Sequence, residues 1–228
     1  MPPRLSGMDT THRSPLARRL GLALLLVIAS ATGFMALRYA LPGQPFAPPL
    51  TNLLTQRDVL VLHAVASGLA LMLGPWQFVT RLRERRPRLH RVIGWGYAGC
   101  LLVGGLASLP LATQADGGWL AQLGFGLLGL LWLVTTSIAI VHIRARRVAA
   151  HRRWMLRSFA LTAGGITLRL QILVGSAFGV PVEAFYTALA WSSWVPQALW
   201  LEWWLWRAAP ATAQRPEPVW QDTQFDAR

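Results

Sequence analysis

The chain has 228 residues, of which 54% are hydrophobic and only 14% are charged, yet its formal net charge is +13. It is too apolar for a disordered basic tail or a soluble nucleic-acid-binding domain, and its one cysteine, Cys100, excludes a disulfide scaffold. This composition predicts an all-α protein that crosses a membrane several times, has the lipid bilayer as its main partner and binds no nucleic acid.

Six segments are apolar over about 20 residues, the length that a helix needs to cross a hydrocarbon core of about 30 Å. These predicted spans cover residues 20–40, 58–80, 90–113, 118–142, 152–178 and 184–206. The connecting segments are short, and the longest, 41–57, is rich in proline. We therefore predict one six-helix transmembrane domain over 20–207, with short tails at 1–19 and 208–228.

Arginine supplies all 22 basic residues, and its distribution predicts the orientation of the spans. Nineteen arginines fall in the two tails, in the link between the second and third spans, and in the link between the fourth and fifth spans. Arg38, Arg57 and Arg169 remain for the opposite side. Both tails are therefore expected in the cytoplasm. In an alternative interpretation, the first span is a secretory signal that is cleaved near Ala29-Ser30-Ala31.

The two arginine-rich links share a pattern that indicates an internal duplication. Arg83-x-Arg85-Arg86-x3-His90-Arg91 recurs as Arg144-x-Arg146-Arg147-x3-His151-Arg152, and Gly104 maps onto Gly165 at the same offset. We predict that residues 58–113 and 118–178 are parallel repeats of a helical hairpin. Spans two to five would then form a central four-helix bundle, with spans one and six at its flanks. Chance similarity of two basic links is the alternative.

Each of the four central spans carries one histidine, namely His63, His90, His142 or His151. His90 and His151 have matching depth, so they could be the two axial ligands of a b-type haem iron. Gly94, one turn after His90, would leave room for the porphyrin, and His142 lies towards the same side. The alternative is that these histidines only extend the arginine-rich belt.

A second candidate site lies towards the opposite side, where His63, Arg169 and Gln171 could line an outer pocket of the quinone or small-anion type. The alternatives are that His63 makes a hydrogen bond between helices, and that Arg169 extends to the interface or pairs with an outer group such as Asp58, Glu183 or an anionic ligand. Glu202 is expected to pair with Arg157. The spans contain no paired carboxylates, which argues against a cation-coupled transporter.

Three motifs together resemble a known family. They are His63-x4-Gly68-x5-Gly74-Pro75-x-Gln77-Phe78, Leu89-His90-Arg91-x2-Gly94-x2-Tyr97, and His151-Arg152-Arg153-Trp154-Met155-x-Arg157-Ser158 followed by Thr162 and Arg169. The chain resembles the predicted membrane proteins called domain of unknown function 2306, over roughly residues 58–175. This resemblance implies a multi-pass protein of the bacterial inner membrane, in a family with no settled activity.

The arrangement of one histidine on each of four consecutive helices is also loosely similar to the transmembrane cytochromes b. We therefore expect a membrane protein that binds haem b and takes part in electron transfer with a quinone or a respiratory-chain protein. The alternative is a cofactor-free accessory or assembly subunit, or a small-solute carrier. The sequence does not indicate whether the protein is an enzyme.

Overall fold

The computed structural model describes residues 15–41 and 55–208, and every regular element within these ranges is helical. Among the described residues, five helices are long and apolar enough to cross a membrane. They are α1 (Pro15–Leu37), α3 (Arg57–Leu73) with the 3-10 turn η2 (Gly74–Phe78) that continues it, α5 (Pro87–Thr113), α6 (Gly118–Arg144) and α7 (Val148–Ala177). These helices correspond to the first five predicted spans.

Shorter elements lie between the first long helices and after α7. They are η1 (Arg38–Ala40), α4 (Thr80–Arg85), η3 (Val182–Ala184), α8 (Tyr186–Ser192) and α9 (Val195–Arg207). The connection between α5 and α6 includes Gly117 and leads to Gly118, and the φ angles of these two residues, 87° and 75°, are left-handed. Only glycine adopts this conformation at little cost, so these two residues let α6 turn back against α5.

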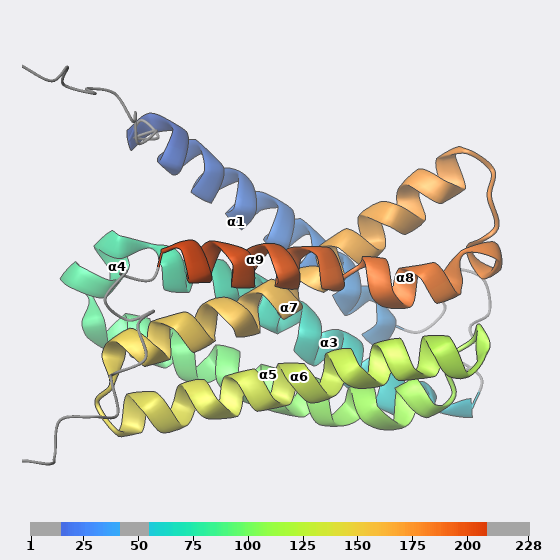
Figure 1. The fold of residues 1–228 in the computed structure, drawn as a ribbon, viewed down its shortest axis with the longest axis horizontal. Helices are drawn as coiled ribbons and strands as arrows, with labels where there is room; N and C mark the ends of the chain where they lie inside the picture. The colour runs from blue at the N-terminus through green and yellow to red at the C-terminus, as the bar shows by residue number, and fades with distance from the viewer. Residues whose placement is uncertain (1–14, 42–54, 209–228) are drawn as a thin grey trace, which may run out of the picture.

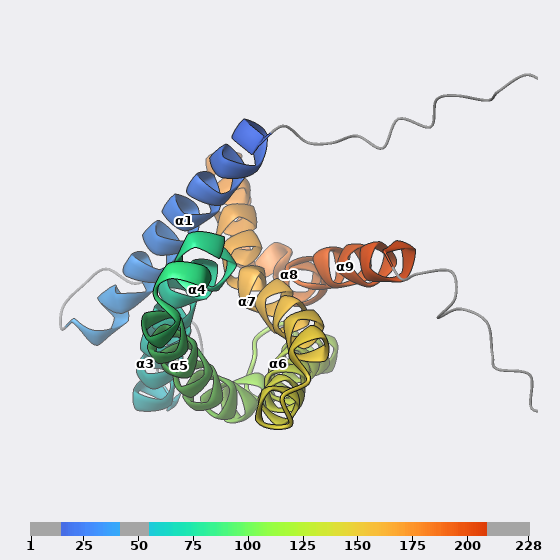
Figure 2. The same cartoon turned by 90° about the vertical axis from the view of Figure 1, so that its left-hand side faces the viewer.

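The long helices α3, α5, α6 and α7 pack in sequence around a ring (Figure 2), with contacts between each helix and the next and between α7 and α3. The first helix, α1, packs against α3, while α8 contacts α6 and α9 contacts α7 (Figure 1). Seen along the bundle in Figure 2, α1 and α9 lie outside the ring. The four central helices therefore enclose the interior in which a site can be built.

The prediction of a sixth continuous span at 184–206 is not confirmed. This segment forms two shorter helices, α8 of 7 residues and α9 of 13 residues, which meet at Ser193 and Trp194. Trp194 has a φ of −134°, outside the helical range, and Pro196 lies in the first turn of α9, where proline starts a helix and does not continue one. Neither helix alone has the roughly 20 residues that a crossing needs.

An ion pair holds α9 against the bundle. Arg157 of α7 donates two hydrogen bonds to Glu202 of α9, from Nε to Oε1 at 2.6 Å and from Nη2 to Oε2 at 2.8 Å. This bidentate geometry is the strong form of an arginine–carboxylate pair. It confirms the predicted pairing of Glu202 with Arg157.

The N-terminal helix crosses α3 where two glycines meet. A Cβ atom added to Gly68 would lie 2.7 Å from the carbonyl oxygen of Gly33 and 3.1 Å from Cβ of Ala36. The two backbones therefore touch directly, as small residues permit in membrane helices. Because α1 begins at Pro15, it includes the last residues of the predicted tail 1–19, and the bounds of that tail stay a prediction. Residues 1–14, the C-terminal tail from 209 and most of the predicted 41–57 loop lie outside the described residues.

The two arginine-rich links fold differently, although their sequences align. The first contains the short helix α4, to which Arg85 belongs, whereas the second is a turn between α6 and α7. In that turn Arg146, the residue that aligns with Arg85, has a left-handed φ of 60°. The internal duplication of 58–113 and 118–178 therefore stays a prediction.

Candidate functional site

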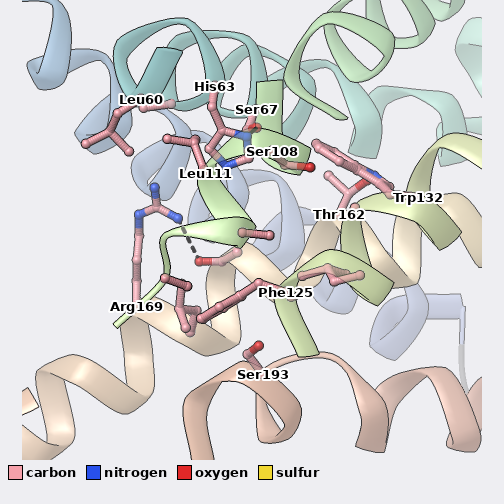
Figure 3. Close-up of a pocket in the computed structure, with 18 of the residues that line it drawn as sticks. Leu60, His63, Ser67, Ser108, Leu111, Phe125, Trp132, Thr162, Arg169 and Ser193 are labelled. Atoms are coloured by element: carbon pink, nitrogen blue, oxygen red, sulfur yellow. Dashed lines mark hydrogen bonds between the residues drawn. The ribbon is translucent and has the colours of Figure 1, made fainter. Parts of the chain in front are cut away.

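A pocket of about 270 Å³ lies between the helices (Figure 3). Its lining residues include Leu60 near the start of α3 and Leu111 near the end of α5, so it lies towards the end of the bundle opposite the arginine-rich links. All four central helices contribute to its wall, and η1, η3 and the α8 region close it. The polar side chains that line it are Tyr39, His63, Ser67, Ser108, Trp132, Thr162, Arg169, Tyr186 and Ser193. The remaining wall is apolar or glycine, and its lining residues include no aspartate or glutamate. A small cavity with few polar groups in an apolar wall is typical of a ligand site.

His63 enters the pocket from α3 (Figure 3), and its Nδ1 atom lies 2.8 Å from the carbonyl oxygen of Gly104 on α5. The predicted hydrogen bond between helices is therefore confirmed. Because a carbonyl oxygen only accepts, Nδ1 carries the proton in this contact. In the neutral ring, Nε2 then keeps its lone pair and can accept a hydrogen bond. Ser67 lies one turn further along α3, and its Oγ atom is 3.5 Å from Nδ1 of His63.

Arg169 extends into the pocket from α7, on the side that faces Leu60 and His63 in Figure 3. Its Nη1 atom donates to the carbonyl oxygen of Gly165, one turn earlier, at 3.0 Å. Within residues 15–41 and 55–208, no salt bridge joins Arg169 to a carboxylate, so the predicted pairing with Asp58 or Glu183 is absent. The guanidinium group therefore retains donors that a ligand can use.

Gln171, the third residue predicted for this pocket, does not line it. It lies in a separate hollow between α7 and α8, where its Oε1 accepts from Ser192 at 3.1 Å. The reason is helical geometry, since two residues along α7 correspond to a rotation of about 200° around the helix axis. The structure thus places His63 and Arg169 around one pocket and Gln171 elsewhere.

A buried hydrogen-bond network adjoins the pocket and joins three helices. The Tyr97 hydroxyl of α5 lies 2.8 Å from Thr162 and 3.0 Å from Ser158, both on α7. From α6, Trp132 donates to Thr162 at 2.7 Å, and Thr136 lies 2.7 Å from Ser158. Tyr97, Thr136 and Ser158 are 0% exposed. Because Thr162 and Trp132 also line the pocket, the network forms part of its wall.

The histidines proposed as haem ligands lie away from this pocket, near the arginine-rich end. His151 is oriented by a hydrogen bond from Nδ1 to the carbonyl oxygen of Ala139, at 2.9 Å. Nδ1 of His90 and of His142 is buried without a hydrogen-bond partner among the described residues. The space beside Gly94 is occupied by Gln77, whose Oε1 would lie 3.2 Å from an added Cβ. Within the described ranges, no group of three or more His, Cys, Asp or Glu residues could hold a metal ion.

Several residues of the site did not emerge from the sequence. Trp132 and Phe125 line the pocket from α6, and Tyr39 lines it from η1. An aromatic residue in a transmembrane segment gives no signal of whether it faces lipid or the interior, so these positions depend on the packing. Ser158 and Thr162 appeared in the sequence only as part of the third motif, and their partners on α6 gave no signal.

The comparisons with known proteins agree with a membrane protein. The family model described as predicted membrane protein (DUF2306) matches residues 60–205, which extends the predicted range of 58–175 through α8 and most of α9. No curated protein and no solved structure matches the chain. Since the family model covers more than half of the sequence, and the described helices are long and apolar, the chain belongs to the DUF2306 family of predicted membrane proteins.

Proposed function

We propose that this membrane protein binds a small lipophilic ligand, of the quinone or small-anion type, in the pocket between His63 and Arg169. The observation that carries the proposal is the 270 Å³ cavity with a guanidinium group and an imidazole in its otherwise mostly apolar wall. Charged and ionisable side chains within a span are costly and mark functional sites. The apolar wall would hold the body of the ligand, and Arg169 and His63 would bind its polar group.

Filling the pocket tests this proposal. A Cβ atom at Gly165 would make only ordinary contacts, at 3.4 Å from Arg169 and from Leu71, so the remainder of a leucine side chain would extend into the cavity. We expect Gly165→Leu to abolish binding of a decyl-benzoquinone probe or of radiolabelled dodecanoate by the purified full chain. Gly99→Leu is the matched control, because a Cβ at Gly99 meets nothing within 4 Å. The proposal fails if neither probe binds the unmodified protein, or if Gly165→Leu binds as the control does.

Haem-linked electron transfer is a second candidate, favoured by the orientation of His151. Histidines that ligate metals commonly donate their other ring N–H to a backbone carbonyl, as His151 does to Ala139. His90 would be the second ligand of the iron, and His142 is predicted to lie towards the same side of the membrane. The arginines of the links would bind the haem propionates. Gln77 would have to leave the space beside Gly94.

Absorption spectroscopy distinguishes this candidate. If His90 and His151 ligate haem, protein from cells supplied with haem shows a b-type band in the reduced-minus-oxidised spectrum. His90→Ala or His151→Ala removes the band. The control is His12→Ala, a change in the predicted N-terminal tail outside the spans, which leaves the band in place. The absence of any band from the unmodified protein leaves the cofactor-free alternatives, which are an accessory or assembly subunit and a small-solute carrier.

The orientation of the chain is also part of the proposal. We place the protein in the bacterial inner membrane with both termini in the cytoplasm, because most arginines belong to the tails and to the links that contain α4 and Arg144–Arg147. In this arrangement α8 and α9 together make the sixth crossing. Reporter fusions test it, since a reporter that is active only in the cytoplasm is expected to be active after Arg207 and inactive after Gly117. Activity at Gly117 alone would reverse the orientation.

A further inference from the structure

A second arginine, Arg38, lies next to the pocket and indicates that the ligand carries a negative charge. Arg38 of η1 stacks on the ring of Tyr39, which itself lines the pocket, with Cζ at 5.6 Å from the ring centroid. Arg38 directly precedes Tyr39, and Tyr39 and Arg169 both line the pocket, so two positively charged side chains belong to this end of the bundle. Two like charges at the end of an apolar bundle repel each other, and this repulsion grows as water is excluded.

Among the described residues, no salt bridge joins Arg38 or Arg169 to a carboxylate. Nε of Arg38 is buried and has no hydrogen-bond partner within residues 15–41 and 55–208, and Arg169 donates only to a backbone carbonyl. The sequence between η1 and α3, residues 42–54, contains neither aspartate nor glutamate. Buried charges in proteins are paired, and the pocket lining contains no aspartate or glutamate, so an anionic ligand would supply the negative charge that Arg169 lacks there.

We propose that the pocket binds an acidic amphiphile, a molecule with an anionic carboxylate or phosphate group and an apolar chain. This inference rests on the proposed function and specifies its ligand. The anionic group accepts charge-assisted hydrogen bonds from Arg169 in the pocket wall, and Arg38, which lies over the ring of the pocket residue Tyr39, adds a second positive charge beside it. The chain occupies the apolar wall, which includes Leu71, Leu128 and Ile172. His63, as an acceptor at Nε2, suits a hydroxyl on the ligand.

Binding of dodecanoate and of its methyl ester tests the proposal, because the two share a chain and differ in charge. The full chain is placed in nanodiscs of phosphatidylcholine, at a pH at which the acid is ionised. We expect dodecanoate to bind at least about tenfold more tightly than the ester, since hydrogen bonds to charged groups are the stronger ones. Arg169→Gln and Arg38→Gln should each weaken dodecanoate binding about tenfold and leave ester binding unchanged.

Arg57→Gln is the matched control. Arg57 is the third arginine predicted for this side, is exposed at the start of α3 and does not line the pocket, so its loss should not change either affinity. Equal affinities for acid and ester, or unchanged dodecanoate binding in both Arg169→Gln and Arg38→Gln, would overturn the inference. If the quinone probe is lost in Gly165→Leu but dodecanoate never binds, the proposed function stands and this inference fails.

The anionic group could belong to a free acid or to a phospholipid headgroup, and the same assay separates these sources. Nanodiscs that contain phosphatidylglycerol present its anionic phosphate headgroup at high concentration. Displacement of dodecanoate by phosphatidylglycerol identifies the lipid headgroup as the occupant. Retention of dodecanoate in these discs identifies a free acid. Both results support an acidic amphiphile, and the comparison with the methyl ester decides whether it is correct.

Discussion

Tyr97→Ala is expected to destabilise the protein by roughly 3–5 kcal/mol, the range for removing a large buried aromatic side chain. Tyr97 is 0% exposed and contacts the core cluster that includes Phe159 and Trp132. Tyr97→Phe keeps the ring and removes only the hydroxyl group. Its expected cost is about 0.6–1.7 kcal/mol, as found for hydrogen bonds between membrane helices.

The direction of the hydrogen bonds explains why the hydroxyl group of Tyr97 matters. Thr162 donates to the carbonyl oxygen of Ser158 at 2.9 Å, so its own oxygen accepts from Trp132 and from Tyr97. Tyr97 in turn can accept from the Ser158 hydroxyl. Removal of the tyrosine oxygen leaves the Ser158 hydroxyl with one partner fewer in an apolar interior.

Unfolding of the detergent-solubilised protein, followed by circular dichroism, measures both changes. Trp95→Ala is the matched control on α5, because Trp95 is 58% exposed on the outer surface and its removal should cost far less. A Tyr97→Ala protein as stable as the control would show that Tyr97 is not a packing centre. Equal losses for Tyr97→Phe and Tyr97→Ala would assign the whole effect to the hydroxyl group.

Gly68→Leu is expected to cause the second large change, a separation of α1 from α3. Even the first carbon of the new side chain would lie 2.7 Å from the backbone oxygen of Gly33, which cannot move without the helix that carries it. Overpacking of this kind costs roughly 1–3 kcal/mol. Because Gly68 also lines the pocket, ligand binding should weaken together with the unfolding midpoint.

The same unfolding assay, combined with probe binding, checks this prediction. Gly99→Leu again serves as the control, since it adds the same side chain in open space. If Gly68→Leu changes neither stability nor binding, α1 does not pack against α3 in the mature protein. That result would favour the alternative in which the first span is a cleaved signal.

The sequence predicted the long helices because twenty apolar residues and flanking arginines are local signals. The same signal failed at 184–206, where apolarity is continuous but the backbone is broken at Trp194. A hydropathy pattern does not distinguish one long helix from two short ones when the break is made by apolar residues. Pro196 was the available indication of the break.

Half of the candidate site could also be predicted. His63 and Arg169 were recognisable as polar residues in apolar segments, and Glu202 as the partner of Arg157, because unpaired charge is costly in lipid. Gln171 was wrong as a pocket residue, although its rotation relative to Arg169 could have been calculated. The occupation of the space beside Gly94 by Gln77 depends on how η2 folds back against α5, which no local pattern specifies.

Thr162 belongs both to the cavity wall and to the hydrogen-bond network between α5, α6 and α7. A ligand that presses on Thr162 or Trp132 therefore acts on the contacts that hold three helices at fixed separation. Ligand occupancy of the pocket should then reduce the conformational fluctuations of the whole bundle. It should slow amide hydrogen exchange around Ser158 as well as near the ligand. A ligand in this cavity would therefore be expected to stabilise the packing of α5, α6 and α7 as well as its own site.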